Sequence, residues 1–398
     1  MRLEKKRKKS KLPIFVLVLV ILVIIQMLRP IGKPSVKLVK FSHQATSGNL
    51  NIVWPPHTQD AIAVQNEGLI EKTPNQTPFP TASVAKIMTA YIILKDHPLK
   101  FGENGPTLTI TNRDVQEYIA DKESGQSVAK VAVGEKLNER QMLEALLLPS
   151  ANNIATILAR WDSGSVENFV EKMNKTAKQL GMTNTHYADP AGISLNTQSS
   201  AYDQVLLAQK AFEIPTFRHI VRMAQATLPV CSTVYNVNYV LGKDGIVGIK
   251  TGSMPQIGAN FVFAAEHFVG YKQITIIGAI FGAKGKEPLM QALNGAITAI
   301  NSTKPYLDLK QIIKKNQLIG TLYYPNGFKT PVIAKDSIYS VVWPSKEINI
   351  EVRVDKNLQL PIKKGQKVGD LIVNAKKVAL LASTNINKPN IIQKLTRL

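Results

Sequence analysis

Apolar residues recur with helical and with strand-like spacing along the chain up to about residue 302. The clearest helix is predicted over residues 84–96, where Ile87, Tyr91 and Leu94 fall on one face. Further helices are predicted over 139–160 with a break near Pro149, over 165–180 before Gly181, and over 286–301. Short apolar runs predict strands at 51–54, 61–64, 246–252, 259–265 and 272–282. This mixture indicates an α+β domain over residues 51–302.

The pattern changes after about residue 303. Short β-branched runs, separated by Pro, Gly, Asn and Lys, then follow one another almost to the end of the chain. They lie at 320–324, 331–334, 338–343, 347–354, 371–374 and 377–381. We therefore expect a separate small all-β domain over residues 303–385 and a tail over residues 386–398.

The N-terminal residues are first strongly basic and then strongly apolar. Residues 2–11 hold seven basic side chains against one acidic, and the apolar segment 12–28 follows them. A helix of that segment, at about 1.5 Å per residue, is about 25 Å long. This is a little short of a membrane core of about 30 Å, but the flanking Lys11 and Arg29 can reach the two interfaces. The pattern predicts a transmembrane signal-anchor that leaves residues 1–11 in the cytoplasm and the rest of the chain outside.

A cleaved signal peptide would begin in the same way. It also needs small residues at a cleavage site, and residues 29–34 offer no small-x-small sequence. An uncleaved anchor is therefore favoured, followed by a stalk or linker over residues 29–50, which contain Pro, Lys and Ser without clear periodicity.

Charge raises the question of an anionic partner. The 398 residues include 49 Lys and Arg against 28 Asp and Glu, a net charge of +21, which suggests nucleic acid, lipid or a wall polymer. No nucleic-acid-binding motif is present, and an extracytoplasmic location disfavours that partner. The six histidines have no metal-ligand spacing, and the single Cys231 permits no internal disulfide. We expect no metal and no cofactor.

A serine and a lysine stand three residues apart at Ser83-Val-Ala-Lys86, at the start of the predicted helix 84–96. That spacing places both on one helix face, about one turn apart. A desolvated lysine near other cations has a lowered pKa and can take the serine proton, while N–H groups at a helix start can stabilise an oxyanion. The same four letters recur at residues 127–130, but no helical pattern follows them. Ser127 and Lys130 are therefore expected to be surface residues.

A second candidate is Ser150-Ala151-Asn152, at the break between the two helices predicted within 139–160. Polar side chains there would be buried beside apolar neighbours and would need hydrogen-bond partners. Other Ser-x-Asn triplets, at 47–49, 194–196 and 383–385, fall in sequence typical of loops or of the stalk.

The third candidate, Lys250-Thr251-Gly252, ends the strand-like run 246–252 and occurs once in the chain. A lysine and a hydroxyl can bind a carboxylate, and a glycine leaves room for a peptide backbone beside the strand. By itself the triplet would fit equally well as a strand end before a turn.

Together and in this order, the three motifs resemble those of the penicillin-recognising serine enzymes. The stretches PTASVAKIMTAYIIL, LLLPSANNIA, GMTNTHYADPAGI and GIVGIKTGSMPQIGANFVFAA are similar to D-alanyl-D-alanine carboxypeptidases of the low-molecular-mass penicillin-binding group, over roughly residues 50–300. LPIKKGQKVGDLIV at 360–373 is similar to their C-terminal β domain. The resemblance implies a β-lactamase/DD-peptidase-like fold, with an antiparallel sheet flanked by helices plus a helical lobe. Ala151, where the family often has Gly, is a departure at a position that contributes backbone.

The resemblance also implies catalytic roles. Ser83 would be the nucleophile and Lys86 its general base. Ser150, hydrogen-bonded to Lys86, would pass the proton to the departing D-alanine, and Asn152 would orient Lys86 and the substrate amide.

The third motif would bind the substrate in this comparison. Lys250 and Thr251 would hold the terminal carboxylate beside Gly252, and the N–H groups of Ser83 and Ser253 would hold the oxyanion. The implied partners are peptidoglycan stem peptides that end in D-Ala-D-Ala, β-lactams as inhibitors, and the membrane.

Other functions share part of this pattern. A class A β-lactamase also needs a Glu-x-x-Leu-Asn segment after the second motif, and none follows residue 152. A DD-transpeptidase or endopeptidase would use the same first step, and the sequence leaves both open. A wall-binding protein with an inactive site is disfavoured because all three motifs are intact.

Overall fold

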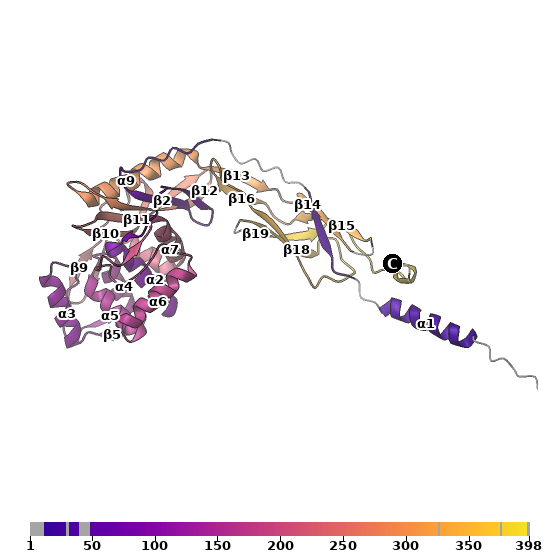
Figure 1. Ribbon diagram of the computed structural model, residues 1–398, viewed down its shortest axis with the longest axis horizontal. Helices are drawn as coiled ribbons and strands as arrows, with labels where there is room; N and C mark the ends of the chain where they lie inside the picture. The colour runs from indigo at the N-terminus through magenta and orange to yellow at the C-terminus, as the bar shows by residue number, and fades with distance from the viewer. Residues whose placement is uncertain (1–11, 29–31, 40–47, 325–326, 375, 396–398) are drawn as a thin grey trace, which may run out of the picture. The chain divides into compact units, whose positions relative to one another are not determined.

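The computed structural model describes residues 12–28, 32–39, 48–324, 327–374 and 376–395 (Figure 1). Packing divides the chain into two compact units. The large unit comprises Thr46–Leu309 with Val341–Lys346, and the small unit comprises Met1–Ala45, Lys310–Ser340 and Glu347–Leu398. The basic segment predicted over residues 1–11 lies outside the described residues.

A five-stranded antiparallel sheet lies at the centre of the large unit, in the order β10-β11-β12-β2-β3. Its strands are β10 (Ile246–Met254), β11 (Gly258–Val269), β12 (Lys272–Ala283), β2 (Gln59–Val64) and β3 (Gly68–Lys72). Four of the strands predicted from the sequence are therefore confirmed. The strand predicted at 51–54 is wrong, because those residues form no regular element.

Alternate residues of the sheet face two different cores. Phe261 and Phe263 pack on the side of α9 (Pro288–Thr303), whereas Val262 and Ala264 pack against the helical lobe. Figure 1 shows α9 on one side of the sheet and the other helices of this unit on the opposite side. This is the two-residue period of a sheet that is covered on both faces.

The large unit contains both expected and unexpected helices. Those predicted over 84–96, 139–160, 165–180 and 286–301 are confirmed as α2 (Lys86–Asp96), α4 (Glu139–Leu147) with α5 (Asn152–Ser163), α6 (Val166–Gln179) and α9. Not predicted were α3 (Asn112–Glu123), α7 (Ala201–Glu213) and α8 (Pro215–Val221). Of α3, only Asp114 is fully buried, so no apolar stripe marks that helix in the sequence.

Short elements connect the helices and strands of the large unit. The strand pairs are β4 (Phe79–Pro80) with β7 (Gln198–Ser199), β5 (Thr107–Thr109) with β6 (Lys136–Asn138), and β8 (Gln225–Leu228) with β9 (Ser232–Tyr235). The 3-10 turns are η1 (Ala82–Ala85), η2 (Lys243–Gly245) and η3 (Lys304–Tyr306). Of these, η1 leads directly into α2.

The small unit contains a six-stranded sheet in the order β1-β14-β15-β19-β18-β17. Its strands are β14 (Leu318–Tyr323), β15 (Lys329–Ala334), β17 (Ile350–Val354), β18 (Lys367–Val373), β19 (Lys376–Ala382) and β1 (Ser35–Leu38). A further pair joins β13 (Asp308–Ile313) to β16 (Ile338–Val342), and the short helix α10 (Ile391–Leu395) lies in the tail. Each β-rich run predicted after residue 303 forms a strand.

Strand β1 comes from the segment that was expected to be a stalk. It pairs with β14 in antiparallel register, with Leu38 opposite Gly320. A Cβ atom at Gly320 would lie 2.5 Å from the Lys37 carbonyl oxygen, so the glycine permits this close pairing. Part of the predicted stalk is thus an edge strand of the C-terminal sheet.

The apolar N-terminal segment forms helix α1 (Leu12–Leu28), 17 residues long. Within the described residues, no helix combines the length and apolar character needed to cross a membrane. The spanning anchor expected from the sequence is therefore unsupported by the structure.

Candidate active site

Ser83 and Lys86 of the first motif are in direct contact. Ser83 lies in η1 and Lys86 is the first residue of α2, so the turn places the two side chains together. The Nζ atom of Lys86 donates to Ser83 Oγ over 2.8 Å and to the carbonyl oxygen of Ala191 over 2.9 Å. Lys86 is completely buried, whereas Ser83 is half-buried. A buried amine beside a partly accessible hydroxyl is the arrangement that activates a serine nucleophile.

Strand β10 lies closely against the turn that carries Ser83. A Cβ atom at Gly252 would come within 2.9 Å of the Ser83 nitrogen and 3.0 Å of the Val84 nitrogen, so only a glycine fits without displacement. Asn260 of β11 holds the preceding residues, because its Nδ2 donates to the carbonyl oxygens of Pro80 and Thr81. The third motif therefore meets the first motif through backbone packing.

The loop that binds Lys86 is organised by Asp189. Its Oδ1 accepts hydrogen bonds from the N–H groups of Ala191, Gly192 and Ile193, at 2.9, 2.6 and 3.0 Å. Gly192 has a φ of +80°, and a Cβ atom there would lie only 1.8 Å from the Ala82 carbonyl oxygen. The loop can thus approach the nucleophile turn closely and present the Ala191 carbonyl to Lys86.

Ser150 and Asn152 of the second motif lie at the start of α5. Ser150 has a φ of +70°, a conformation that non-glycine residues rarely adopt and that recurs at functional sites. Both side chains are buried. Among the described residues, Ser150 Oγ and Asn152 Oδ1 have no hydrogen-bond partner. Buried polar atoms of this kind are costly unless a ligand or water satisfies them.

The hydrogen bond expected between Ser150 and Lys86 is not present. Lys86 Nζ donates to Ser83 and Ala191 instead, and neither Ser150 Oγ nor Asn152 Oδ1 accepts a hydrogen bond from it. The sequence could not anticipate this geometry, because Ala191 reaches Lys86 only through the fold of a distant loop.

The third motif contributes another buried amine. Lys250 is 1% exposed, and its Nζ donates to the carbonyl oxygen of Thr251 over 3.0 Å. Thr251 and Gly252 are also buried, whereas Ser253 is exposed. An ammonium group has three N–H donors, so Lys250 keeps capacity to bind an anion.

Both buried lysines have lowered pKa values. Burial lowers the pKa of Lys86 well below its usual range, and the nearby positive charge of Lys250 lowers it further. The negative charges of Asp189 and Asp121 act on the Lys86 pKa in the opposite direction. Burial also lowers the pKa of Lys250 to about 7. The neutral form of Lys86, which can accept a proton, is therefore more accessible than that of an ordinary exposed lysine.

The second Ser-x-x-Lys copy lies in a loop after α3. Ser127 and Lys130 are both exposed, which confirms the expectation from the sequence. The loop still contributes to the site through its backbone, because the Asn152 N–H donates to the Ser127 carbonyl oxygen over 2.8 Å.

Sequence reasoning missed three residues that arrange this site. Asp189, Asn260 and Gln126 act through hydrogen bonds to backbone or to Asn152. Asp189 and Asn260 lie within stretches that carried the family resemblance, which was the one available signal for them. Gln126 lies in no such stretch.

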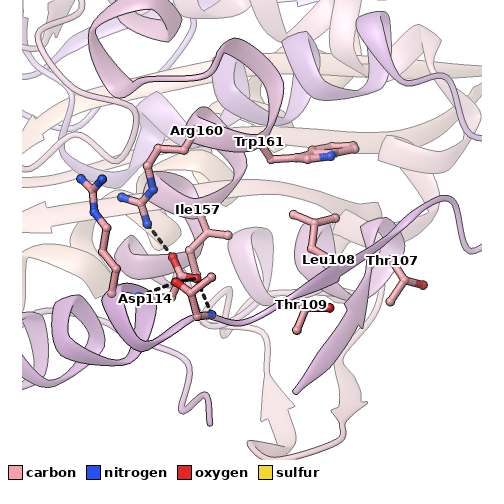
Figure 2. A pocket seen from close by; sticks show the side chains of 9 residues that line it. Thr107, Leu108, Thr109, Asp114, Ile157, Arg160 and Trp161 are labelled. Carbon is pink, nitrogen blue, oxygen red and sulfur yellow. Dashed lines mark hydrogen bonds and ion pairs between the residues drawn. The ribbon is translucent and has the colours of Figure 1, made fainter. Parts of the chain in front are cut away.

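A separate groove of about 480 Å³ opens between β5, α3 and α5 (Figure 2). It is lined by Thr107, Thr109, Ile157 and Trp161, among others, and by Arg160, which is ion-paired with Asp114. No residue of the three motifs lines this groove. The reactive groups therefore lie elsewhere.

Comparisons with known families match both units. A family described as D-alanyl-D-alanine carboxypeptidase matches residues 57–285, more than half of the chain. A family described as the C-terminal domain of penicillin-binding protein 5 matches residues 307–388.

Individual relatives agree with these matches. D-alanyl-D-alanine carboxypeptidase DacF of Bacillus subtilis is 26% identical over 317 residues, which cover 77% of each chain. The solved structure of a Streptomyces DD-transpeptidase is 26% identical, covers 65% of this chain and 99% of its own, and has a TM-score of 0.55. Penicillin-binding protein 5 of Haemophilus influenzae shares the fold at 20% identity, with a TM-score of 0.62 over 86% of this chain and 99% of its own.

Proposed function

The chain belongs to the D-alanyl-D-alanine carboxypeptidase family, and on that premise we propose that Ser83 forms an acyl-enzyme with stem peptides that end in D-Ala-D-Ala. The observation that carries this proposal is the 2.8 Å contact between Lys86 Nζ and Ser83 Oγ, with Lys86 completely buried. A neutral lysine amine has a lone pair, so in that state the serine hydroxyl donates across the same contact.

In the first step, Ser83 Oγ bonds to the carbonyl carbon between the two terminal D-alanines while its proton passes to Lys86. The C–N bond then breaks, and the departing D-alanine amine receives a proton through Ser150. This role for Ser150 is supported by its buried, unpartnered Oγ. Water then attacks the ester, which releases the shortened peptide and restores the Ser83 hydroxyl.

Substrate binding is assigned to the third motif. Lys250 and Thr251 bind the terminal carboxylate, and Gly252 lets this strand pack closely against the turn that carries Ser83. The N–H groups of Ser83 and Ser253 stabilise the oxyanion. Asn152 contacts the substrate amide, which would satisfy its buried Oδ1.

Labelling with a penicillin tests the nucleophile. β-Lactams would acylate Ser83 in the same first step, so a fluorescent penicillin is expected to label the full chain and the Ser127→Ala variant but not Ser83→Ala. The Ser127 variant is a matched control, since it removes the same hydroxyl from the same four-residue sequence. Labelling that survives Ser83→Ala and is lost with Ser127→Ala would reverse the assignment.

The acceptor of the acyl group distinguishes two activities. A structural relative is named a DD-transpeptidase, so transfer to an amine in place of water is the second candidate. Incubation of the enzyme with a pentapeptide and an amine acceptor separates the two. A carboxypeptidase gives mainly the hydrolysed tetrapeptide, whereas a transpeptidase gives the amide.

Extracytoplasmic residence at the cell membrane is also proposed. It is supported by the seven basic residues within 2–11 and by the apolar, solvent-exposed side chains of α1. The full chain is expected in the membrane fraction, and a chain that lacks residues 2–28 is expected to leave it. N-terminal sequencing of the membrane-bound protein would distinguish a retained anchor from a cleaved signal.

A further inference from the structure

Gln126 contacts the second motif directly. Its Oε1 accepts a hydrogen bond from Asn152 Nδ2 over 2.8 Å, while its own Nε2 donates to Ser124 Oγ over 3.1 Å. Both ends of the Gln126 amide are therefore in use, which fixes which end meets Asn152.

The contact with Gln126 determines how the Asn152 amide lies. Because Nδ2 points to Gln126, Oδ1 at the other end of the planar amide is turned away from Gln126. That oxygen belongs to a side chain only 7% exposed and has no partner among the described residues. Gln126 thereby presents Asn152 as a hydrogen-bond acceptor. Without it, the amide could rotate and exchange the positions of its oxygen and nitrogen.

The loop that carries Gln126 is attached to the start of α5 by several hydrogen bonds. Asn153 Nδ2 donates to the Ala129 carbonyl oxygen over 2.9 Å, and Asn153 Oδ1 accepts from the Ala129 N–H over 3.1 Å. The Asn152 N–H donates to the Ser127 carbonyl oxygen. The backbone that supports Gln126 is therefore held on the same helix turn as Asn152.

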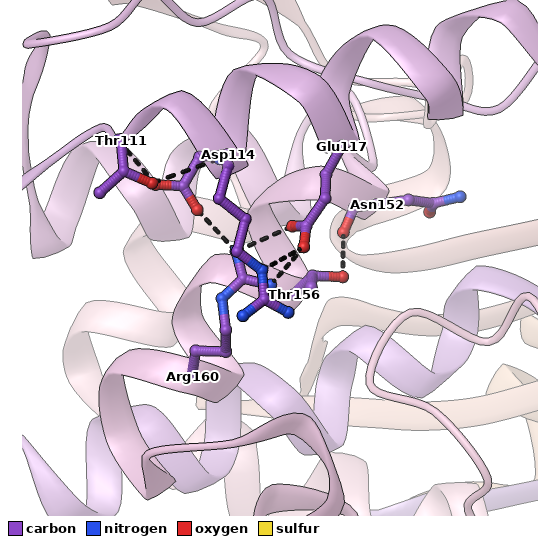
Figure 3. Close-up of polar contacts among 7 residues, drawn as sticks. Thr111, Asp114, Glu117, Asn152, Thr156 and Arg160 are labelled. Atoms are coloured by element: carbon purple, nitrogen blue, oxygen red, sulfur yellow. Dashed lines mark hydrogen bonds and ion pairs between the residues drawn. The ribbon is translucent and has the colours of Figure 1, made fainter.

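Helix α3, which precedes this loop, is held to α5 by an ion-paired cluster (Figure 3). Arg160 of α5 lies 2.6 Å from Asp114 Oδ1 and 2.8 Å from Glu117 Oε2, both of α3. Figure 3 shows these side chains in the gap between the two helices, with Asn152 and Thr156 further along α5. Two attachments thus fix the position of Gln126 relative to Asn152.

We infer that Gln126 is a positioning residue for acyl transfer to Ser83, and that it acts by holding the Asn152 amide with its oxygen available to the substrate. The inference rests on the proposed function. It gives the loop with the second Ser-x-x-Lys copy a role that its exposed Ser127 and Lys130 do not have.

A double-mutant cycle on the full-length protein tests this inference. The measured quantity is the second-order rate of acylation by a fluorescent penicillin.

Gln126→Leu, which removes the acceptor but keeps the side-chain length, is expected to slow acylation about 10-fold, the size of one lost hydrogen bond. In an Asn152→Ala background the same substitution is expected to change the rate by less than about 2-fold, because the residue it acts through is gone. Ser127→Ala, which removes the exposed hydroxyl next to Gln126 in the same loop, is the matched control and should stay within about 2-fold of wild type.

Equal losses in both backgrounds would overturn the inference, since they would show that Gln126 acts through general stability. So would an unchanged rate for Gln126→Leu in the otherwise wild-type chain. Gln126→Glu keeps an acceptor oxygen and should acylate faster than Gln126→Leu on the high-pH plateau of the acylation rate, where an added negative charge has the least effect on Lys86 protonation. A rate no faster than that of Gln126→Leu would also count against it. If the wild-type chain is not acylated, the proposed function fails, and this outcome is distinct from all of these.

Discussion

The amine of Lys86 donates a hydrogen bond to the carbonyl oxygen of Ala191, whose N–H is in turn bound by the carboxylate of Asp189. These two hydrogen bonds connect the loop around Asp189, which is distant in the sequence, to Lys86, the general base that we assign to Ser83. They also explain why the loop geometry matters for chemistry, because a displaced Ala191 would leave a buried amine without one of its partners.

Replacement of Asp189 by Asn is expected to displace this loop. The carboxylate accepts from four N–H groups and from the Thr197 hydroxyl, and an amide would turn a donor toward some of these donors. We expect a loss of roughly 1–3 kcal/mol in unfolding free energy and at least about a 10-fold slower acylation. Denaturant unfolding and penicillin labelling measure the two effects, and normal values for both would contradict the role given to Asp189.

Replacement of Gly192 by Ala tests the close approach of the loop to the nucleophile turn. The added Cβ would lie 1.8 Å from the Ala82 carbonyl oxygen, at a φ of +80°. We expect the rate of penicillin acylation to fall by more than about 10-fold, or the fold to be lost. Gly181→Ala is the matched control, because Gly181 has a φ of +75° with nothing within 4 Å. It should cost only about 1 kcal/mol of stability and leave acylation unchanged. Equal effects of the two substitutions would show that backbone conformation alone, and not the contact, is responsible.

Two charged residues near Lys86 should shift the pH dependence of acylation in opposite directions. Acylation requires neutral Lys86, so its rate should rise with pH as that amine loses its proton. Asp121 raises the Lys86 pKa, so Asp121→Asn should move this rise to lower pH. Lys250 lowers the Lys86 pKa, so Lys250→Gln should move the rise to higher pH. Acylation rates across the pH range measure both shifts, and shifts in the same direction would contradict the assignment of Lys86 as base.

How much of this could be predicted from the sequence depends on the kind of contact. Ser83 and Lys86 meet within one helical turn, so their contact follows from local geometry. Strands 246–252, 259–265 and 272–282 were recognisable because they are buried apolar runs. The hydrogen bond expected between Ser150 and Lys86 was wrong, because the Lys86 amine donates to the carbonyl oxygen of Ala191 instead. Sequence spacing carries no information on the loop that contains Ala191.

Elements without an apolar pattern were also missed. Helix α3 is fixed by the Arg160 ion pairs and by the capping box of Thr111 with Asp114, not by a buried stripe. Strand β1 was taken as part of a stalk, because an edge strand of four residues shows little periodicity. Gln126 gave no signal at all, since its role depends on one side-chain contact formed by tertiary folding.

The free energy of unfolding should depend on the protonation of Glu139, a buried acid outside the active site. Glu139 is completely buried, its two oxygens have no hydrogen-bond partner among the described residues, and burial raises its pKa to about 7. The folded protein therefore holds this proton up to about pH 7, while the unfolded chain releases it near its ordinary pKa of 4.5. The stability contributed by the bound proton is present at low pH and is lost as pH rises through the folded-state pKa. Glu139→Gln should thus stabilise the protein more at pH 8 than at pH 5, by on the order of 2 kcal/mol.

Denaturant unfolding at the two pH values measures this difference. Glu171→Gln, at an exposed position of α6, is the control and should show little change between them. A Glu139→Gln variant that is equally stabilised, or destabilised, at both pH values would contradict the burial of an unpaired carboxyl group.

The most direct test of the account is the release of D-alanine from a muramyl pentapeptide that ends in D-Ala-D-Ala, measured with the full-length protein. We predict catalytic release by wild type and by Ser127→Ala, and no release above background by Ser83→Ala or Lys86→Ala. Release that persists in a folded Ser83→Ala variant, or its absence from a folded wild-type protein, would contradict the central claim that the contact between Ser83 and Lys86 carries out acyl transfer.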